Sequence, residues 1–403
     1  MKSAHFSKKV ISILIITLLS GSLSSCGKET ANKGILAEEE INQSSDDDLQ
    51  SSFNSSAYDN VAKGENGYYF LSSGSMNIMY FDKESLTSFP LCGKADCKHT
   101  DDTCNSYLGR QTHIPSTIYY YKGYIYIIKI NGGDAILERV NADGSARKEL
   151  GIICPTRAIN NIHLVFYSDT IYVFDGGDQI YSDTEQKNVI SKFSLDGKSQ
   201  GNVFEYTGKN IVILSGTSYG NKLYFLMRQI TKDVDGKLIG TNLGLFAYDY
   251  ATQETEQVKD SNINDYCVDV KNSIIYYFVV GDGLYKYSIT TKENNKIFEA
   301  GEDTGICNIA YDGKNLYMNN IYWCVNQKVY LKKILDSKCW IINTDGSFKN
   351  TIDCNGIFYI YYGDENFLIA SKMNNSSPES LAYINMKDIE NAKGWTPLVS
   401  TVK

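Results

Sequence analysis

Apolar and aromatic runs alternate with polar turns from about residue 57 to the C-terminus. The segment 274–298 shows the unit clearly, because an apolar strand (274–280), a Gly-Asp-Gly turn, an alternating strand (284–288) and one more short strand follow one another. Period-two alternation bounded by Gly, Asp and Asn is typical of antiparallel hairpins. Since similar units recur along the chain, the pattern predicts a repeat protein built from β-meanders.

Each repeat is marked by a strand whose centre joins an apolar residue to tyrosine. These anchors recur every 41 to 57 residues. The seven anchors are Tyr68-Tyr69, Ile125-Tyr126, Ile171-Tyr172, Leu223-Tyr224, Ile275-Tyr276, Leu316-Tyr317 and the diverged Phe367-Leu368. Their regular spacing predicts seven structural modules.

Other strands are predicted around each anchor. A strand of the form apolar-x-x-apolar-[Asp/Asn/Ser] follows most anchors, as at 137–141 and 284–288, and another strand precedes most of them, as at 211–215. In three modules Asp-Gly supplies the positive φ that a tight hairpin needs. These pairs are Asp143-Gly144, Asp196-Gly197 and Asp345-Gly346. With one more strand after each hairpin, every module has four.

Seven four-stranded modules predict an all-β protein, a β-propeller of about seven antiparallel blades with six or eight as alternatives. The first module (57–91) and the last (357–399) are the least regular, and they must meet to close the ring. The one helical pattern, at 386–392, is short. A sandwich of this length would need two domains and would not explain the shared period.

The N-terminus has the features of a lipoprotein signal. Residues 1–26 comprise a basic start, an apolar run at 10–19 and the sequence Leu23-Ser24-Ser25-Cys26. The apolar run is too short to span a bilayer permanently. The last four residues resemble the lipobox of bacterial lipoproteins, which implies cleavage before Cys26, acylation of its thiol and amine, and retention at the extracytoplasmic face of the cell membrane. A plain secretory signal with a chance cysteine is the alternative.

Residues 27–56 differ in composition from the rest of the chain. They are rich in Ser, Asn, Glu and Asp, and include the acidic runs 38–40 and 46–48. Such a stretch cannot bury enough apolar surface to fold. We therefore expect a disordered acidic tether, with the propeller domain at 57–403.

Composition supports the all-β fold class, and charge limits the expected partners. The chain has 31 Tyr and 16 Phe but only 5 Pro. This composition favours β-strands that have one apolar side and tyrosine side chains whose hydroxyl ends are solvated. The net charge is -8 and the pI about 5.2. Because nucleic-acid binding requires clustered Lys and Arg, nucleic acid is not an expected partner.

One dense group of potential metal ligands lies in a polar Cys/His loop at 92–104. Cys92, Cys97, His99 and Cys104 are spaced Cys-x4-Cys-x-His-x4-Cys. Three thiolates and an imidazole can complete a tetrahedral zinc shell, although the spacing is not that of a familiar zinc finger. Because the site is expected outside the membrane, the sequence favours a disulfide between two of the thiols over a metal, with free thiols as a third alternative. No cofactor is expected elsewhere.

The remaining cysteines are assigned to structure. Lipidation of Cys26 leaves nine of the ten cysteines, an odd number that cannot pair completely within one chain. Cys324 and Cys339, each beside a tryptophan, are candidates for a disulfide across neighbouring strands. Small buried residues are the alternative interpretation of that pair.

Known catalytic motifs are not found. The chain lacks His-Glu-x-x-His and Gly-x-Ser-x-Gly, and Gly197-Lys198-Ser199 lacks the preceding glycine of a phosphate-binding loop. His163 lies in an apolar strand, which favours a packed core residue over a base. The run 233–236 partly resembles a calcium loop, but Asn242 stands where a glutamate is required, which favours a simple turn.

The repeats resemble propellers of the low-density-lipoprotein-receptor type and TolB-like propellers. Together with the lipobox and the acidic tether, the segment 90–99 is similar to a set of uncharacterised lipoproteins from anaerobic Gram-positive bacteria that carry such a propeller. The blade strands here read Tyr-Tyr-Phe-Val or Tyr-Met-Asn-Asn and not Tyr-Trp-Thr-Asp, so receptor-type ligand residues cannot be transferred. The resemblance implies a shape and a location, and no reaction.

These observations predict a membrane-tethered, extracytoplasmic binding or scaffolding module that recognises a protein, a peptide or a glycan. One alternative is an enzyme, such as a glycan lyase, hydrolase or lactonase, with its site at the mouth of the channel. The other is an assembly factor for exported proteins.

Overall fold

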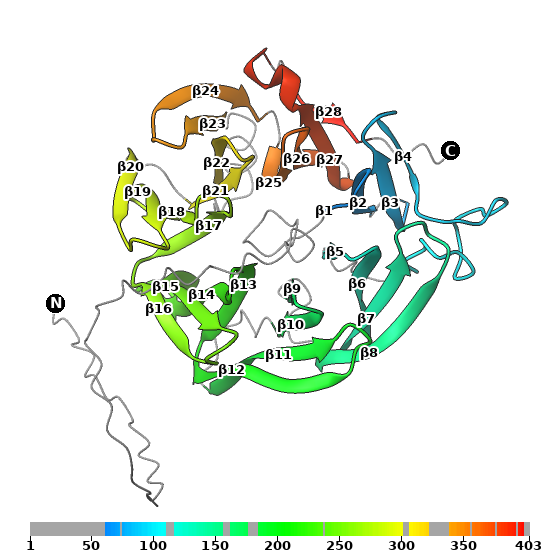
Figure 1. Cartoon of the computed structure of the whole chain (residues 1–403), viewed down its shortest axis with the longest axis horizontal. Helices are drawn as coiled ribbons and strands as arrows, with labels where there is room; N and C mark the ends of the chain where they lie inside the picture. Colours follow the sequence, from blue (N-terminus) through cyan, green and yellow to red (C-terminus); the bar gives the residue numbers. More distant parts are fainter. Residues whose placement is uncertain are drawn as a thin grey trace, which may run out of the picture. The chain divides into compact units, whose positions relative to one another are not determined.

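The computed structural model describes residues 61–398, apart from 73–74, 110–116, 156–161, 176–183, 237, 301–305, 322–337, 355–356, 375–376 and 392–393. All the described strands belong to one compact unit. They form seven four-stranded antiparallel sheets arranged as blades around a ring (Figure 1). The predicted all-β propeller with seven blades is confirmed.

The blades follow one another along the chain. The first three are β1 (Val61–Lys63), β2 (Gly67–Ser72), β3 (Asn77–Asp82) and β4 (Thr87–Pro90); β5 (Ile118–Tyr121), β6 (Tyr124–Asn131), β7 (Asp134–Asn141) and β8 (Arg147–Pro155); and β9 (His163–Tyr167), β10 (Thr170–Phe174), β11 (Glu185–Ser194) and β12 (Ser199–Lys209). The next two are β13 (Ile211–Tyr219), β14 (Lys222–Lys232), β15 (Leu238–Asp249) and β16 (Thr255–Lys259); and β17 (Ile263–Asp269), β18 (Ile274–Val279), β19 (Gly283–Ser288) and β20 (Asn294–Glu299).

The ring is completed by blades 6 and 7. These are β21 (Ile306–Tyr311), β22 (Asn315–Ile321), β23 (Lys338–Asn343) and β24 (Phe348–Asp353); and β25 (Ile357–Gly363), β26 (Phe367–Asn374), β27 (Ser377–Asn385) and β28 (Thr396–Pro397). The short 3-10 helix η3 (Met386–Asn391) lies where the sequence shows its one helical pattern. No helix among the described residues has the length and apolar character needed to cross a membrane.

Every predicted tyrosine anchor lies on the second strand of its blade, from Tyr69 on β2 to Leu368 on β26. The first strands face the centre of the ring in Figure 1. Because successive residues of a strand point to opposite faces, each anchor pair sends one side chain toward each neighbouring blade. In blade 5, for example, Tyr276 packs with blade 6 and Ile275 packs with blade 4.

The core consists of seven hydrophobic clusters, and each fills the interface between two consecutive blades. A tyrosine hydroxyl also forms a hydrogen bond across every interface. In ring order these bonds join Tyr69 to the Ala142 carbonyl, Tyr119 to the Leu164 amide, Tyr167 to Asn221, Tyr266 to the Tyr224 carbonyl, Tyr311 to Asp269, Tyr317 to the Met386 sulfur and Tyr68 to Asp364. The high tyrosine content therefore serves the blade interfaces, since a buried ring needs a partner for its hydroxyl.

The ends of the ring meet through side chains. Each sheet contains only consecutive strands, so the described strands of blade 7 do not pair with those of blade 1. Instead, Val61, Tyr68 and Phe70 of blade 1 pack against Phe367 and Ile369 of blade 7. The expectation that the first and last blades meet is confirmed.

The Asp-Gly turns also contact the preceding blade. A Cβ on Gly197 would lie 2.6 Å from the Leu150 carbonyl oxygen of blade 2, and one on Gly346 would lie 1.7 Å from the Ile297 carbonyl oxygen of blade 5. Both glycines have a positive φ, of 84° and 90°. Glycine is thus required twice at these turns, for the backbone conformation and for the close approach.

Candidate metal centre

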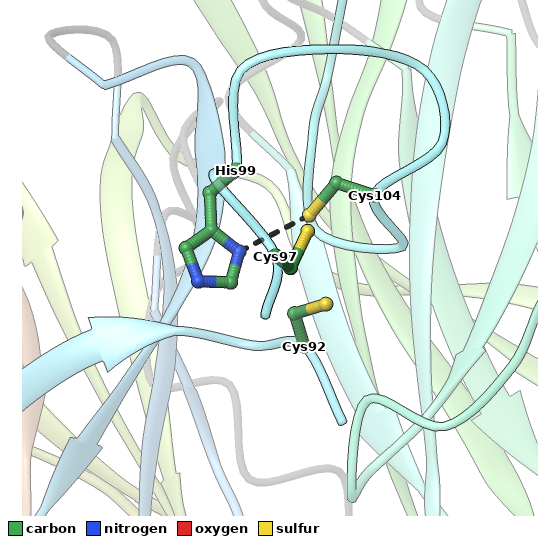
Figure 2. Close-up of side chains that lie close together, drawn as sticks. All are labelled: Cys92, Cys97, His99 and Cys104. Atoms are coloured by element: carbon green, nitrogen blue, oxygen red, sulfur yellow. Dashed lines mark hydrogen bonds between the residues drawn. The ribbon is translucent and has the colours of Figure 1, made fainter. Parts of the chain in front are cut away.

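The Cys/His loop brings its four predicted ligands together between blades 1 and 2. One ligand atom from each of Cys92, Cys97, His99 and Cys104 lies within 4.8 Å of the others. Figure 2 shows the imidazole Nδ1 facing the sulfur atoms, and this nitrogen lies 3.3 Å from Cys104 Sγ. Cys104 is buried, and the other three are partly exposed. Within the part of the chain that the structure describes, this is the one such group of three or more potential ligands.

Local backbone turns fold the loop around this point. Beyond β4, the Cys97 amide donates to the Lys94 carbonyl at 3.4 Å, and the Cys104 amide donates to the Asp101 carbonyl at 3.0 Å. Between these turns His99 has a φ of 57°, in the left-handed region that a non-glycine residue rarely adopts. The ligands before and after His99 come within 4.8 Å of one another.

Two buried polar residues contact the ligands through hydrogen bonds. Cys104 Sγ lies 3.1 Å from the Ser106 hydroxyl, which donates to Asn77 Oδ1 at 2.8 Å. Asn77 Nδ2 in turn donates to the His99 carbonyl at 3.2 Å. Because Asn77 begins β3, this relay fixes two of the four ligands to the sheet of blade 1. Polar groups behind the ligands commonly orient them in metal sites.

The thiols of the cluster differ in acidity. Burial opposes ionisation of Cys104, but hydrogen bonds from the Ser106 backbone amide, His99 and Cys97 outweigh it and lower the pKa of Cys104 to about 6. At Cys97 the backbone amide of His99 lowers the pKa, whereas desolvation and the neighbouring thiols of Cys104 and Cys92 raise it, with a net increase. A thiolate is the form that binds metal, so Cys104 is prepared for coordination at neutral pH.

The loop is also attached to blade 2. The Gly93 amide and Asn105 Nδ2 both donate to the Gly144 carbonyl, at 3.1 and 2.8 Å. A Cβ on Gly144 would lie 2.7 Å from the Cys92 amide nitrogen. Just beyond the loop, the Tyr107 carbonyl accepts a hydrogen bond from the guanidinium of Arg147 on β8.

Of the other predicted site residues, only Cys339 can be placed. Among the described residues the loop cysteines Cys92, Cys97 and Cys104 are free thiols, and Cys339 is fully buried on β23. Cys26 and Cys324 lie outside the described residues, as do the signal segment 1–26 and the tether 27–56. The lipidation of Cys26 and the Cys324–Cys339 disulfide therefore remain predictions.

His163 is a packed core residue, as predicted. It is 4% exposed, with Nδ1 lying 3.1 Å from the Tyr119 hydroxyl and Nε2 lying 2.9 Å from the Gly216 carbonyl oxygen. Since these groups belong to blades 2 and 4, the side chain links three consecutive blades. The run 233–236 is a turn closed by the Gly236 amide and the Asp233 carbonyl, again as predicted.

Three supporting residues of the site could not be recognised from the sequence. Asn77, Ser106 and Gly144 show no ligand pattern of their own. The Asp143-Gly144 pair signals a hairpin, and only the ring geometry shows that this hairpin meets the Cys/His loop. The four ligands together could hold a metal ion, and protein atoms alone would complete a tetrahedral shell.

No family model matches the chain, and no curated protein matches it in sequence. Solved structures resemble it in fold. An oligogalacturonate lyase in complex with manganese shares 11% identity at a TM-score of 0.41, over 63% of this chain and 70% of that one. A puromycin-hydrolyzing peptidase from Mycobacterium tuberculosis shares 10% identity at a TM-score of 0.44, over 81% of this chain and 49%, about half, of that one.

The propeller domain of the Trilobed protease from Pyrococcus furiosus, described as having an open velcro topology, is similar over nearly its whole length. It shares 10% identity at a TM-score of 0.43, over 85% of this chain and 96% of that one. At such identities the similarity concerns the propeller fold alone, and the reactions of the lyase and the peptidase are not transferred.

Proposed function

We propose that this protein is a lipid-anchored, extracytoplasmic binding or scaffolding propeller that performs no reaction of its own. The proposal joins the lipobox at Cys26 and the acidic tether at 27–56 to the observed seven-bladed ring. The tether would hold the ring away from the outer face of the cytoplasmic membrane, where its loops can meet a protein, a peptide or a glycan. Propellers present broad loop surfaces suited to such recognition.

The observation that carries the proposal is the use of buried acids and His163 as contacts between blades. Asp269 accepts a hydrogen bond from Tyr311 at 2.9 Å, and Asp364 accepts one from Tyr68 at 2.7 Å. Asp265 accepts bonds from Asn308 and from a backbone amide of β21. Asp265, Asp269 and Asp364 each join two blades and His163 joins three, so these four groups already have structural partners.

The cofactor that we place in this protein is a structural zinc ion at the Cys/His loop. The loop follows the outermost strand of blade 1, at the periphery of the ring in Figure 1, away from the first strands that surround the centre. Three cysteines and one histidine would leave no open coordination position for a substrate. A zinc ion held there supports the fold and not a reaction.

Binding and turnover can be measured on the same preparation. The full acylated chain in detergent micelles should bind selected members of a glycan array or a peptide array in a saturable manner, and an untargeted substrate screen should show no product. Turnover of a glycan, a peptide or a lactone would contradict the proposal and favour the enzyme alternative.

The anchor has a separate test. In the native host, Cys26→Ala should abolish incorporation of labelled fatty acid and release the protein from the membrane fraction, because two or more acyl chains give a stable anchor at about 0.8 kcal/mol per buried CH₂. Cys267→Ala, which removes a buried thiol of blade 5, serves as the control and should remain in the membrane fraction. Membrane retention of the Cys26 variant without label would refute lipidation.

A further inference from the structure

We infer that Cys92, Cys97, His99 and Cys104 bind one Zn²⁺ ion that clasps blade 1 to blade 2. This inference rests on the structural zinc of the proposed function and gives that ion its role. It is independent of the ligand that the ring recognises.

The spacing of the four ligand atoms fits a single ion. Around a tetrahedral zinc with Zn–S bonds of about 2.3 Å, the sulfur atoms would lie roughly 3.8 Å apart. The four ligand atoms here already lie within 4.8 Å of one another. The site can therefore close on an ion through small side-chain movements, without refolding of the loop.

A disulfide explains the arrangement less well than a metal. A disulfide would use two of the three cysteines and give no role to the third thiol or to His99. The imidazole Nδ1 lies 3.3 Å from Cys104 Sγ and faces the sulfur atoms (Figure 2). All four side chains converge, as a metal requires and a disulfide does not.

The ligand set selects the metal. Thiolate and imidazole ligands in a tetrahedral arrangement favour zinc over calcium, magnesium and manganese, which prefer oxygen. A shell completed by protein atoms is that of a structural site. Ser106 and Asn77 supply the polar groups behind the ligands, and they are 0% and 1% exposed.

The attachments of the loop give the ion its mechanical role. On one side, the relay of Ser106 and Asn77 ties Cys104 and His99 to β3 of blade 1. On the other, Gly93 and the Cys92 backbone meet Gly144 of the β7–β8 turn in blade 2. An ion that joins Cys92 to Cys104 and His99 therefore connects the two blades.

The test begins with the metal content of the full chain purified without oxygen. Inductively coupled plasma mass spectrometry should find one zinc per wild-type chain, and Cys97→Ala should lose it. The matched control is Cys267→Ala, which removes a buried thiol of blade 5 and should keep the zinc. Ser106→Ala should bind zinc roughly 10- to 100-fold more weakly, because it removes a group that orients Cys104.

A second readout does not depend on variants that must fold. Chelation of zinc from the wild-type chain should leave its far-ultraviolet circular dichroism spectrum unchanged but expose the loop to trypsin at Lys98. Readdition of zinc should restore protection. Cobalt in place of zinc should show the charge-transfer and ligand-field bands of a tetrahedral thiolate site.

Four results would overturn the inference. These are equal zinc in the wild type and Cys97→Ala, a disulfide among the three loop cysteines in the anaerobic protein, iron in place of zinc, and trypsin cleavage at Lys98 that does not depend on the metal. None of these results bears on membrane anchoring or ligand binding. Conversely, catalytic turnover by the zinc-loaded chain would contradict the proposed function and leave the clasp intact.

Discussion

The contact between Tyr68 and Asp364 should contribute measurably to stability, because it lies where the two ends of the ring meet. The Tyr68 hydroxyl of blade 1 donates to Asp364 Oδ2 of blade 7 at 2.7 Å, and Lys63 Nζ lies 3.0 Å from the same oxygen. Tyr68→Phe removes one hydroxyl and leaves the ring of the side chain in place. The perturbation therefore isolates one hydrogen bond across the closure.

The size of the stability loss in Tyr68→Phe follows from the environment of Asp364. Its side chain is 6% exposed. Burial alone would raise the pKa of Asp364, but the Phe367 amide, Tyr68 and Lys63 lower it below its ordinary value, so the lost bond is one to a charged group. Such bonds contribute about 1.5–3 kcal/mol. Because Lys63 still reaches the same oxygen, we expect Tyr68→Phe to lower the free energy of unfolding by about 2 kcal/mol.

Urea unfolding followed by tryptophan fluorescence measures the loss. Tyr285→Phe is the matched control, since Tyr285 donates to Asp282 at 2.6 Å within one hairpin of blade 5. Asp282 is 42% exposed, so this second loss should stay below about 1 kcal/mol. Equal effects of the two substitutions, or no effect of Tyr68→Phe, would refute the claim that this contact locks the closure.

Two further predictions concern blades 5 and 6. Burial raises the pKa of Asp265 to about 7, above its ordinary value of 3.8. Between these two values the folded state binds more protons than the unfolded state. The free energy of unfolding should therefore fall as the pH rises from about 4 to about 7. Asp265→Asn should remove this decline, which urea unfolding at about pH 5 and about pH 8 measures. The same change in stability between the two pH values in the variant would contradict the role of Asp265. Gly346→Ala should lower the free energy of unfolding by about 1–3 kcal/mol more than Gly313→Ala. Both glycines have a φ near 90° (90° and 92°), but only a Cβ at Gly346 meets backbone, 1.7 Å from the Ile297 carbonyl oxygen. Equal melting temperatures for the two variants would contradict the packing of this turn.

The architecture could be predicted from sequence because a blade is specified locally. Six of the seven second strands carry a tyrosine anchor and the seventh has the diverged Phe367-Leu368, while each Asp-Gly pair specifies a hairpin within a few residues. A local pattern repeated seven times also gives the number of blades. The partner of each tyrosine hydroxyl could not be predicted, because residues such as Tyr68 and Asp364 lie at opposite ends of the chain and meet only when the ring closes.

In the candidate site, the ligands could be predicted from the sequence but most of the groups that support them could not. Cys92, Cys97, His99 and Cys104 are close in sequence, so their spacing alone suggests a cluster. Of its supporting groups, Ser106 is close in sequence but has no ligand pattern, Asn77 lies on β3, and Gly144 belongs to the next blade. The tyrosine content favoured strands with solvated hydroxyl ends, whereas eight tyrosines are fully buried: Tyr68, Tyr119, Tyr121, Tyr126, Tyr266, Tyr276, Tyr277 and Tyr317. Composition alone does not distinguish a buried tyrosine from an exposed one.

The central claim is that the Cys/His loop serves structure and not catalysis. X-ray absorption at the zinc edge, on the full chain purified without oxygen, tests it most directly. We predict three sulfur ligands at about 2.3 Å and one nitrogen at about 2.0–2.1 Å. A shell that contains a water oxygen, and thus an open catalytic position, or a chain without zinc, would contradict the account.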